Sequence, residues 1–274
     1  MELFLTLLGD IKVFRWPFFV VYDPAGYQVK GADVRAAMEC LQPGDILVRG
    51  YSSYLDGYFI PSYFSHAGLY LGDVTEDDRR LVPDPLPADT PFAPGKQMVV
   101  HAIAEGVQME DLLQFCRCDT LAVLRFPAEL QRTCVVPEEI VSKLPFIHPE
   151  EKEIFDELNA GGTVPFERAF PVIRRSALSL LGIDYDFEFD FLEFNSVSCT
   201  ELLFYATRCL SPFLGVFPEK TRVLFFDHVG IVPDALVRSP LSVVWQSPSC
   251  DVAEIEKLRE AVRTPPAAAR TRAA

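Results

Sequence analysis

Residues 199–210 have the sequence CTELLFYATRCL, and this stretch decides how the fold is interpreted. Apolar side chains recur in it at intervals of three and four residues, which is the pattern of a single helical stripe. Ser196 or Ser198 precedes the stripe and is suited to capping the first turn. We therefore predict a helix that begins at or within one residue of Cys199 and packs on a sheet. The stripe consists of Cys199, Leu202, Leu203, Ala206, Cys209 and Leu210.

The position of Cys199 is chemically suggestive. Free N–H groups and the macrodipole at a helix N-terminus favour an anion such as a thiolate. On this basis we expect Cys199 to have a depressed pKa and to be alkylated faster than the other six cysteines near pH 6. The alternative interpretation is that Cys199 is a small buried hydrophobic residue.

Four histidines are available as partners for this thiol. His66 lies in a predicted strand over 65–72, and His101 lies in another over 98–103. His148 and His228 lie beside proline or turn-like residues and are expected at the surface. Cysteine catalysis needs an imidazole that faces the thiol and a polar group that orients the imidazole. Two histidines in strands can also be ordinary core residues.

Residues 183–191 alternate between apolar and acidic side chains, which predicts a half-buried strand. The acidic row could suggest a cation site, but a solvated strand face is favoured, because hard-cation sites usually need converging loops. Elsewhere we predict helices at 32–41, 165–181 and 251–262, strands at 45–49 and 120–126, a surface loop at 73–96 and broken helical pieces at 135–164. The predicted organisation is an aromatic-rich N-terminal arm (1–30), a catalytic domain (31–250), and a C-terminal helix with a disordered tail (251–274).

Composition limits the function classes. The formal net charge of −14 argues against general nucleic-acid binding and against docking on anionic lipid by charge alone. Seven cysteines without regular spacing indicate mostly reduced thiols. The first residues lack the features of a signal peptide, and no apolar run is long enough to span a bilayer. We expect a soluble, cytoplasmic protein, with its oligomeric state open.

A zinc site is a weaker alternative. Cys116, Cys118, Cys134 and His148 could be imagined as ligands, but their spacing lacks the paired motifs of structural zinc sites. No phosphate-binding loop, dinucleotide fingerprint or nucleophile-elbow motif occurs either.

Several short motifs together resemble one family. They are Pro43-Gly-Asp-Ile-Leu47, His66-Ala-Gly-Leu-Tyr-Leu-Gly72, Glu105-Gly-Val107, Asp184-Tyr-Asp186, Ser198-Cys-Thr-Glu-Leu202 and Val232-Pro-Asp-Ala-Leu236. Their order over about 41–240 is similar to that of the YiiX/YaeF-type permuted papain-like amidases and cysteine peptidases of the NlpC-type superfamily. Lecithin:retinol acyltransferase and its relatives are cousins with the same order of parts.

The resemblance implies a fold and a set of roles. The fold is α+β and circularly permuted papain-like, with the nucleophile helix packed on an antiparallel sheet. Cys199 corresponds to the nucleophile, His66 to the base and His101 to the residue that orients it. YiiX-like members tend to have Glu at the third place, whereas the acyltransferase relatives have His, and Glu105 is a weaker candidate. Ser198 or the Cys199 N–H could contribute to an oxyanion hole.

The expected function is therefore a thiol hydrolase that cleaves an amide or related acyl bond through an acyl-thioester on Cys199. It needs no metal or organic cofactor, and its partner is a peptide, amide or acyl-lipid substrate. Two alternatives stay open: an acyltransferase, and a non-catalytic binding module with the same fold.

Overall fold

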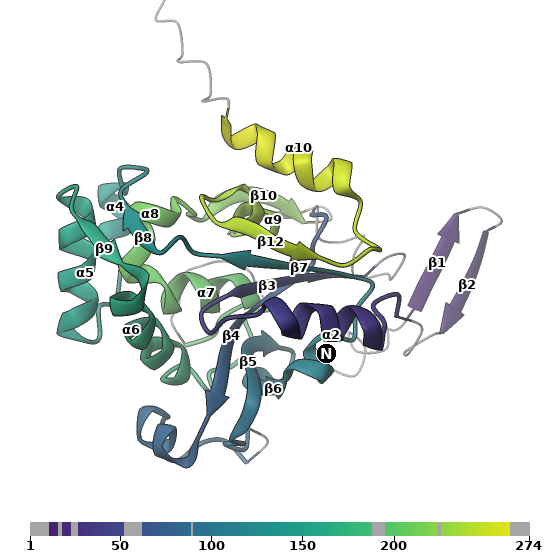
Figure 1. The fold of residues 1–274 in the computed structure, drawn as a ribbon, viewed down its shortest axis with the longest axis horizontal. Coiled ribbons are helices and arrows are strands. Elements are labelled where there is room, and N and C mark those ends of the chain that lie inside the picture. The colour runs from purple at the N-terminus through teal and green to yellow at the C-terminus, as the bar shows by residue number, and fades with distance from the viewer. Residues whose placement is uncertain are drawn as a thin grey trace, which may run out of the picture.

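A six-stranded antiparallel sheet forms the centre of the molecule (Figure 1). The computed structural model describes residues 11–15, 18–22, 27–51, 62–88, 90–187, 195–223 and 226–263. The strands lie in the order β12 (Ser242–Gln246), β7 (Thr120–Arg125), β3 (Ile46–Gly50), β4 (His66–Val74), β5 (Gly95–Ile103) and β6 (Gly106–Asp111).

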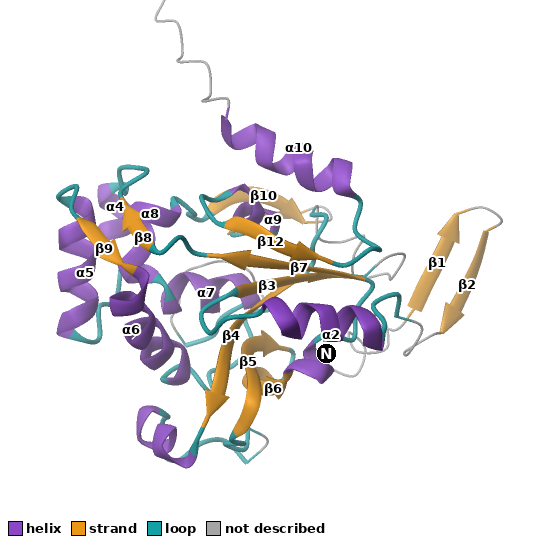
Figure 2. Cartoon of the chain, viewed as in Figure 1, coloured by secondary structure: helices purple, strands orange, loops and turns teal. Residues whose placement is uncertain are grey.

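Helices cover both faces of this sheet (Figure 2). In β3, Ile46 and Val48 face one apolar cluster and Leu47 faces the other, because successive strand residues point to opposite sides. The first cluster includes side chains of α5 (Pro149–Asn159), α6 (Phe166–Leu178) and α7 (Cys199–Ala206). The second includes side chains of α2 (Gly31–Cys40) and the short α3 (Leu112–Phe115). The predicted α+β fold, with the Cys199 helix packed on an antiparallel sheet, is confirmed.

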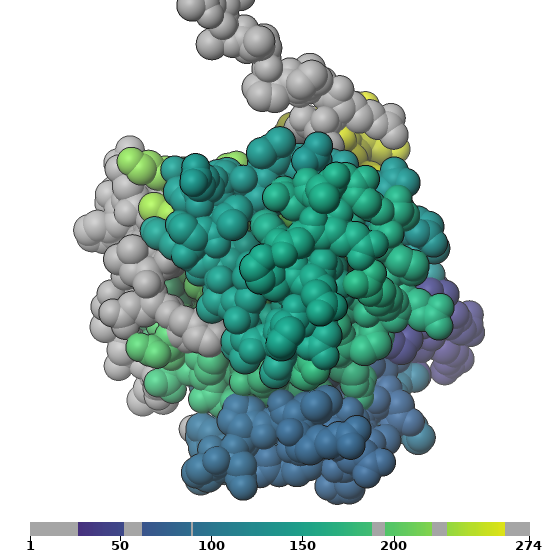
Figure 3. Space-filling view, turned by 90° about the vertical axis from the view of Figure 1, so that its left-hand side faces the viewer, coloured from purple at the N-terminus to yellow at the C-terminus, as the bar shows by residue number. Residues whose placement is uncertain are grey.

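The remaining elements surround this core. Figure 3 shows that the segments around α5 and α6 cover one side of the molecule, above the segment that contains η2. The strands β1 (Ile11–Arg15) and β2 (Phe18–Tyr22) pair as an antiparallel hairpin beside the main body (Figure 1). The others are η2 (Glu76–Leu81), β8 (Glu129–Gln131), α4 (Glu138–Val141), β9 (Thr163–Pro165), η3 (Arg208–Leu210), α8 (Ser211–Leu214), β10 (Glu219–Val223), β11 (Phe226–Gly230), α9 (Asp234–Arg238) and α10 (Val252–Arg263).

Two residues of the sequence motifs, Asp234 and Asp45, connect segments of the fold through side-chain hydrogen bonds. The buried Asp234 carboxylate, at the start of α9, accepts hydrogen bonds from the backbone N–H groups of Tyr63 (2.7 Å) and Phe64 (2.9 Å). Asp45 accepts from Arg125 Nε at 2.8 Å and from its Nη2 at 2.7 Å. The hydrogen bonds of Asp234 hold the chain just before His66 in place, and those of Asp45 connect the residue before β3 to the end of β7.

Three sequence predictions need correction. Residues 183–187 form no strand, because the Ile183 carbonyl accepts from the Val107 N–H of β6 and Asp184 forms only an isolated bridge with Ser196. Within this segment Asp186 is buried, not solvated; residues 188–191 lie outside the described part. The loop at 73–96 contains the 3₁₀ helix η2. The helix at 199–210 ends at Ala206 and continues as η3.

Candidate active site

The start of α7 is fixed by a reciprocal cap. Ser198 is the N-cap residue, and its hydroxyl accepts a hydrogen bond from the Glu201 N–H at 3.4 Å. Its own N–H donates to Glu201 Oε2 at 2.6 Å. This capping box makes Cys199 the first residue of the helix. The Ser198 hydroxyl, which we considered for an oxyanion hole, therefore serves the cap, while the Cys199 N–H lies in the first turn, where helical N–H groups have no intrahelical acceptor.

Cys199 lies where the sheet opens. The pairing of β4 with β5 begins only at Leu69 and Val100, so the first residues of β4 do not pair with β5. The backbone N–H groups of Ala67 and Thr200 lie near enough to the Cys199 thiol to lower its pKa. The residue Cys199 is 6% exposed. This arrangement places the sulfur beside the residue that follows His66.

The two strand histidines contact each other directly. His66 Nε2 lies 2.8 Å from His101 Nδ1, and the two rings are nearly perpendicular. His101 is fully buried, and its Nε2 lies 3.1 Å from Glu110 Oε2 on β6. That second contact is an ion-pair distance without good hydrogen-bond alignment. The side chains form a continuous chain from His66 to Glu110.

Arg49 completes the cluster on the opposite side of His66. The register of β3 and β4 pairs Arg49 with His66, so both side chains lie on one face of the sheet. The guanidinium lies over the Phe115 ring, 4.4 Å from its centroid, and Nη1 donates to the Phe115 carbonyl at 2.6 Å. The Phe115 ring also contacts both histidine rings. We call Cys199, His66, His101, Glu110 and Arg49 the candidate-site cluster.

Burial controls the charges of the cluster. Burial lowers the pKa of His66 well below its usual 6.5, and the positive charge of Arg49 lowers it further. Burial also lowers the pKa of His101, although Glu110 opposes the shift. Burial raises the pKa of Cys199 to about 11, which the Ala67 N–H and Arg49 offset only in part. The expectation of a depressed thiol pKa is therefore wrong, because loss of hydration outweighs the helix N-terminus. The resting pair is a neutral thiol and a neutral imidazole.

The other candidates lie elsewhere. Glu105 is exposed in the turn between β5 and β6, and it is Glu110 whose carboxylate reaches His101. His148 precedes α5 at its N-cap position, and the His228 side chain lies outside the described part. Among the described residues, no group of three or more His, Cys, Asp or Glu is arranged to hold a metal ion. None of the described helices is both long enough and apolar enough to cross a bilayer.

Sequence reasoning missed Glu110 and Arg49. Glu110 was missed because β6 was not predicted, although the Glu105-Gly106 turn was a usable signal for a hairpin that returns beside β5. Arg49 ends a predicted strand, where a cation is ordinarily solvated. Its burial depends on Phe115, which is distant in sequence.

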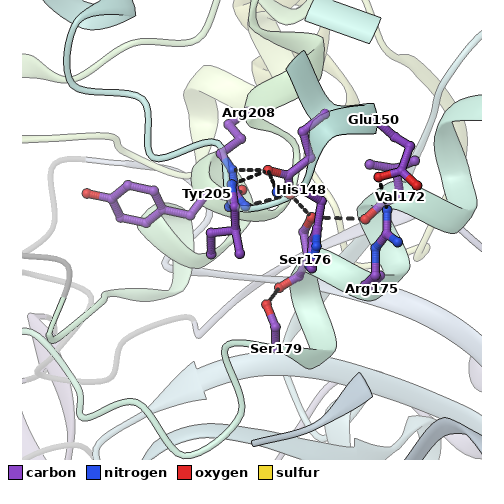
Figure 4. Close-up of polar contacts among 10 residues, drawn as sticks. His148, Glu150, Val172, Arg175, Ser176, Ser179, Tyr205 and Arg208 are labelled. Carbon is purple, nitrogen blue, oxygen red and sulfur yellow. Dashed lines mark hydrogen bonds and ion pairs between the residues drawn. The ribbon is translucent and has the colours of Figure 1, made fainter. Parts of the chain in front are cut away.

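A second buried ionic cluster holds the other end of α7 (Figure 4). Arg208 and Glu151 are 1% and 0% exposed, and Arg208 donates to the two carboxylate oxygens from Nη2 (2.5 Å) and Nε (3.0 Å). Arg208 Nη1 donates to the Tyr205 carbonyl at 2.6 Å. Ser176 on α6 hydrogen bonds to Glu151 as well. We call Arg208, Glu151 and Ser176 the Arg208 cluster.

Comparison with known proteins finds one family that part of the chain resembles. Residues 40–136 match the family model described as permuted papain-like amidase enzyme, YaeF/YiiX, C92 family. The matched segment contains Arg49, His66, His101 and Glu110 and ends before Cys199. No curated protein and no solved structure matches the chain significantly. The resemblance to YiiX/YaeF-type permuted papain-like amidases, stated from the sequence, is confirmed by this match.

Proposed function

We propose, starting from the match to permuted papain-like amidases, that the chain is a cysteine-dependent amidase with Cys199 as nucleophile. The observations that carry this proposal are the chain of contacts from His66 through His101 to Glu110 and the thiol at the start of α7, whose pKa, raised by burial, is lowered in part by the backbone of Ala67, the residue after His66. A nucleophile, a base and a group that orients the base are the parts that thiol acyl transfer requires. Here they come from α7, β4 and β5.

The protonation states follow from Glu110. Burial raises the pKa of this carboxyl, but His101 and Arg49 lower it by more, so Glu110 is a carboxylate that only accepts. His101 therefore carries its proton on Nε2, which leaves Nδ1 as an acceptor for the Nε2–H of His66. The lone pair of neutral His66 is then on Nδ1. This nitrogen is the base in the proposed reaction.

The reaction balances without an external acid. As the Cys199 sulfur attacks the amide carbonyl, His66 Nδ1 takes the thiol proton, and a tetrahedral oxyanion forms. The imidazolium then protonates the departing amine, the C–N bond breaks, and an acyl-thioester remains on Cys199. Water attacks the thioester and gives its proton to His66, which returns it to the thiolate as the carboxylic acid leaves. His101 and Glu110 stabilise the transient imidazolium.

An acyltransferase is the second candidate. The observation that favours it is His101 at the third place, where the acyltransferase relatives also have histidine. Both reactions form the same thioester and differ in whether water or an amine or alcohol removes the acyl group. We propose hydrolysis, because the family matched is one of amidases.

The test is a pulse and chase. The protein is treated with an activated acyl ester, the mass increase is located by peptide mapping, and the adduct is followed in buffer with and without an amine acceptor. We expect the label on Cys199 and its prompt loss in buffer alone. Cys199→Ala should not be labelled, whereas the matched control Cys209→Ala, which also removes a buried thiol, should be labelled normally.

Each contrary outcome has a definite meaning. An adduct that persists until an acceptor is added assigns a transferase. A Cys199→Ala protein that still acquires the label contradicts the proposed nucleophile. If no activated ester labels the wild-type protein, the binding-module alternative is favoured.

A further inference from the structure

Arg49 carries a buried charge that is only partly satisfied. The residue is 8% exposed, and Nη1 donates to the Phe115 carbonyl. Nε is buried without a hydrogen-bond partner. Within the described residues no acceptor is bonded to Nε or Nη2, and no carboxylate forms an ion pair with this guanidinium. A buried charge without its hydrogen bonds is costly, so an unpaired donor of this kind calls for an explanation.

The donors that remain have a specific geometry. Nε and Nη2 lie along one edge of the guanidinium, and this edge presents two parallel N–H groups. Such a fork matches the two oxygens of a carboxylate or the oxygens of a phosphate. The Phe115 carbonyl accepts from Nη1, so both donors of this bidentate edge are left without an acceptor among the described residues. Stacking of the guanidinium on Phe115 fixes its plane.

Arg49 also lies next to the residues of the proposed chemistry. Arg49 is the cross-strand partner of His66 and is close enough to influence the pKa values of Cys199, His66, His101 and Glu110. The net charge of the chain is −14, so an anionic substrate would be repelled at long range unless a local cation received it. A fixed, desolvated cation beside the nucleophile provides such a receptor.

We propose that the Nε–Nη2 edge of Arg49 is an oxyanion subsite that binds a carboxylate on the substrate close to the scissile amide. The substrate class is then acyl compounds with a second, free carboxylate, such as monoamides of short dicarboxylic acids. This inference rests on the proposed function, because it concerns substrate choice at Cys199. Arg49 is a specificity-determining residue in this proposal.

The experiment uses three activated esters that differ only in the group at the far end of the acyl chain. The p-nitrophenyl monoester of glutaric acid carries a carboxylate, its carboxamide analogue is neutral, and a phosphonate analogue carries the other oxyanion. The second-order rate of mass increase on Cys199 is measured for each. We expect the carboxylate probe to react roughly 100-fold faster than the neutral probe, a ratio equivalent to one strong charge-assisted contact.

Variants assign the preference to Arg49. In Arg49→Gln we expect the carboxylate-to-neutral ratio to fall to about 1, and in Arg49→Lys we expect an intermediate ratio, because an ammonium lacks the fork. Arg35→Gln removes one exposed cation from α2 and should keep the wild-type ratio. Thermal melting shows that each variant is folded. If Arg49→Gln does not fold, the carboxylate-to-neutral rate ratio of Arg49→Lys is the test of whether Arg49 causes the preference.

The outcomes separate the two proposals. A wild-type ratio of 1 or below, or an equal loss for all probes in Arg49→Gln, overturns the subsite and leaves the thiol mechanism intact. A phosphonate probe faster than the carboxylate probe overturns the carboxylate assignment. If no probe labels Cys199, the proposed function fails. The subsite is then tested alone through the rise in melting temperature with glutarate, which should vanish in Arg49→Gln.

Discussion

Two buried clusters of charge lie at opposite ends of α7, and they differ in how completely their groups are paired. In the Arg208 cluster, Arg208 Nε, Nη1 and Nη2 all have acceptors, and both oxygens of Glu151 accept hydrogen bonds. In the candidate-site cluster, Arg49 Nε and His101 Nε2 are buried without well-aligned partners. Both clusters are desolvated, so burial alone does not distinguish them.

The difference indicates where function resides. A buried network in which every member is satisfied fixes structure, here by joining α5 and α6 to the end of α7. A network that keeps open donors is less favourable for folding and is retained where a ligand or a reaction uses the open positions. The same helix is thus anchored beyond its C-terminal end by the Arg208 cluster and begins at Cys199, the proposed nucleophile.

The largest expected effect is at Cys199. Cys199→Ala should reduce acyl transfer by roughly 10⁴-fold or more, because the nucleophile is removed. Its free energy of unfolding should change by no more than about 1–2 kcal/mol, since only one sulfur atom is lost. Acyl-enzyme formation and chemical denaturation measure the two effects. If Cys199→Ala destabilises the protein as much as an Arg208 substitution does, the proposed functional difference between the two ends of α7 is contradicted.

Substitutions of His66, His101 and Glu110 should reduce the acylation rate by progressively smaller factors. His66→Ala removes the base and should cost roughly 10²–10⁴-fold in rate. His101→Gln keeps a polar group beside His66 and should cost less, and Glu110→Gln, one step further away, should cost least. Single-turnover acylation by a neutral activated ester provides the measurement. Full activity in His66→Ala would refute the assignment of the base.

Arg208→Met should have the opposite effect: a large loss of stability with little change in the acylation rate. Removing this partner leaves the Glu151 carboxylate buried and unpaired, so the free energy of unfolding should fall by about 3–5 kcal/mol. The acylation rate per folded molecule should stay at the wild-type value. The double variant Glu151→Leu/Arg208→Met removes both charges and should recover most of the lost stability. A large fall in acylation rate with intact folding would mean that this end of α7 also takes part in the reaction.

The residues show which properties a sequence can predict. Periodicity located the helix start at Cys199 and the strands of His66 and His101, because these are local patterns. The strand prediction is wrong for residues 183–187, because alternation does not show which partners a segment has: Ile183 bonds to Val107 of β6 and Asp184 to Val197. The thiol pKa was predicted with the wrong sign because burial is a tertiary property. Arg49 and Glu110 were missed for the same reason, since each acquires its role from a neighbouring strand.

The smallest expected effect is the dependence of the free energy of unfolding on acid pH. The two clusters should lose their stabilisation in different pH ranges. Burial lowers the pKa values of His66 and His101 below 6.5, so the unfolded chain binds more protons than the folded one when pH falls below that value. Their stabilisation is complete above pH 6.5 and decreases as the solution becomes more acidic, by at most about 1.4 kcal/mol per pH unit for each histidine. Burial raises the pKa of Glu151, but Ser176 and Arg208 lower it by more, so the net shift is below 4.5. Its stabilisation is therefore present above pH 4.5 and is lost only below that value. Urea denaturation at pH 7.5, 6.0 and 5.0 measures this decline in the free energy of unfolding. The decline should be shallower in His101→Gln than in the wild type, and in Glu151→Leu/Arg208→Met it should equal that of the wild type. An equal decline in His101→Gln and the wild type would show that these histidines are not the groups that titrate.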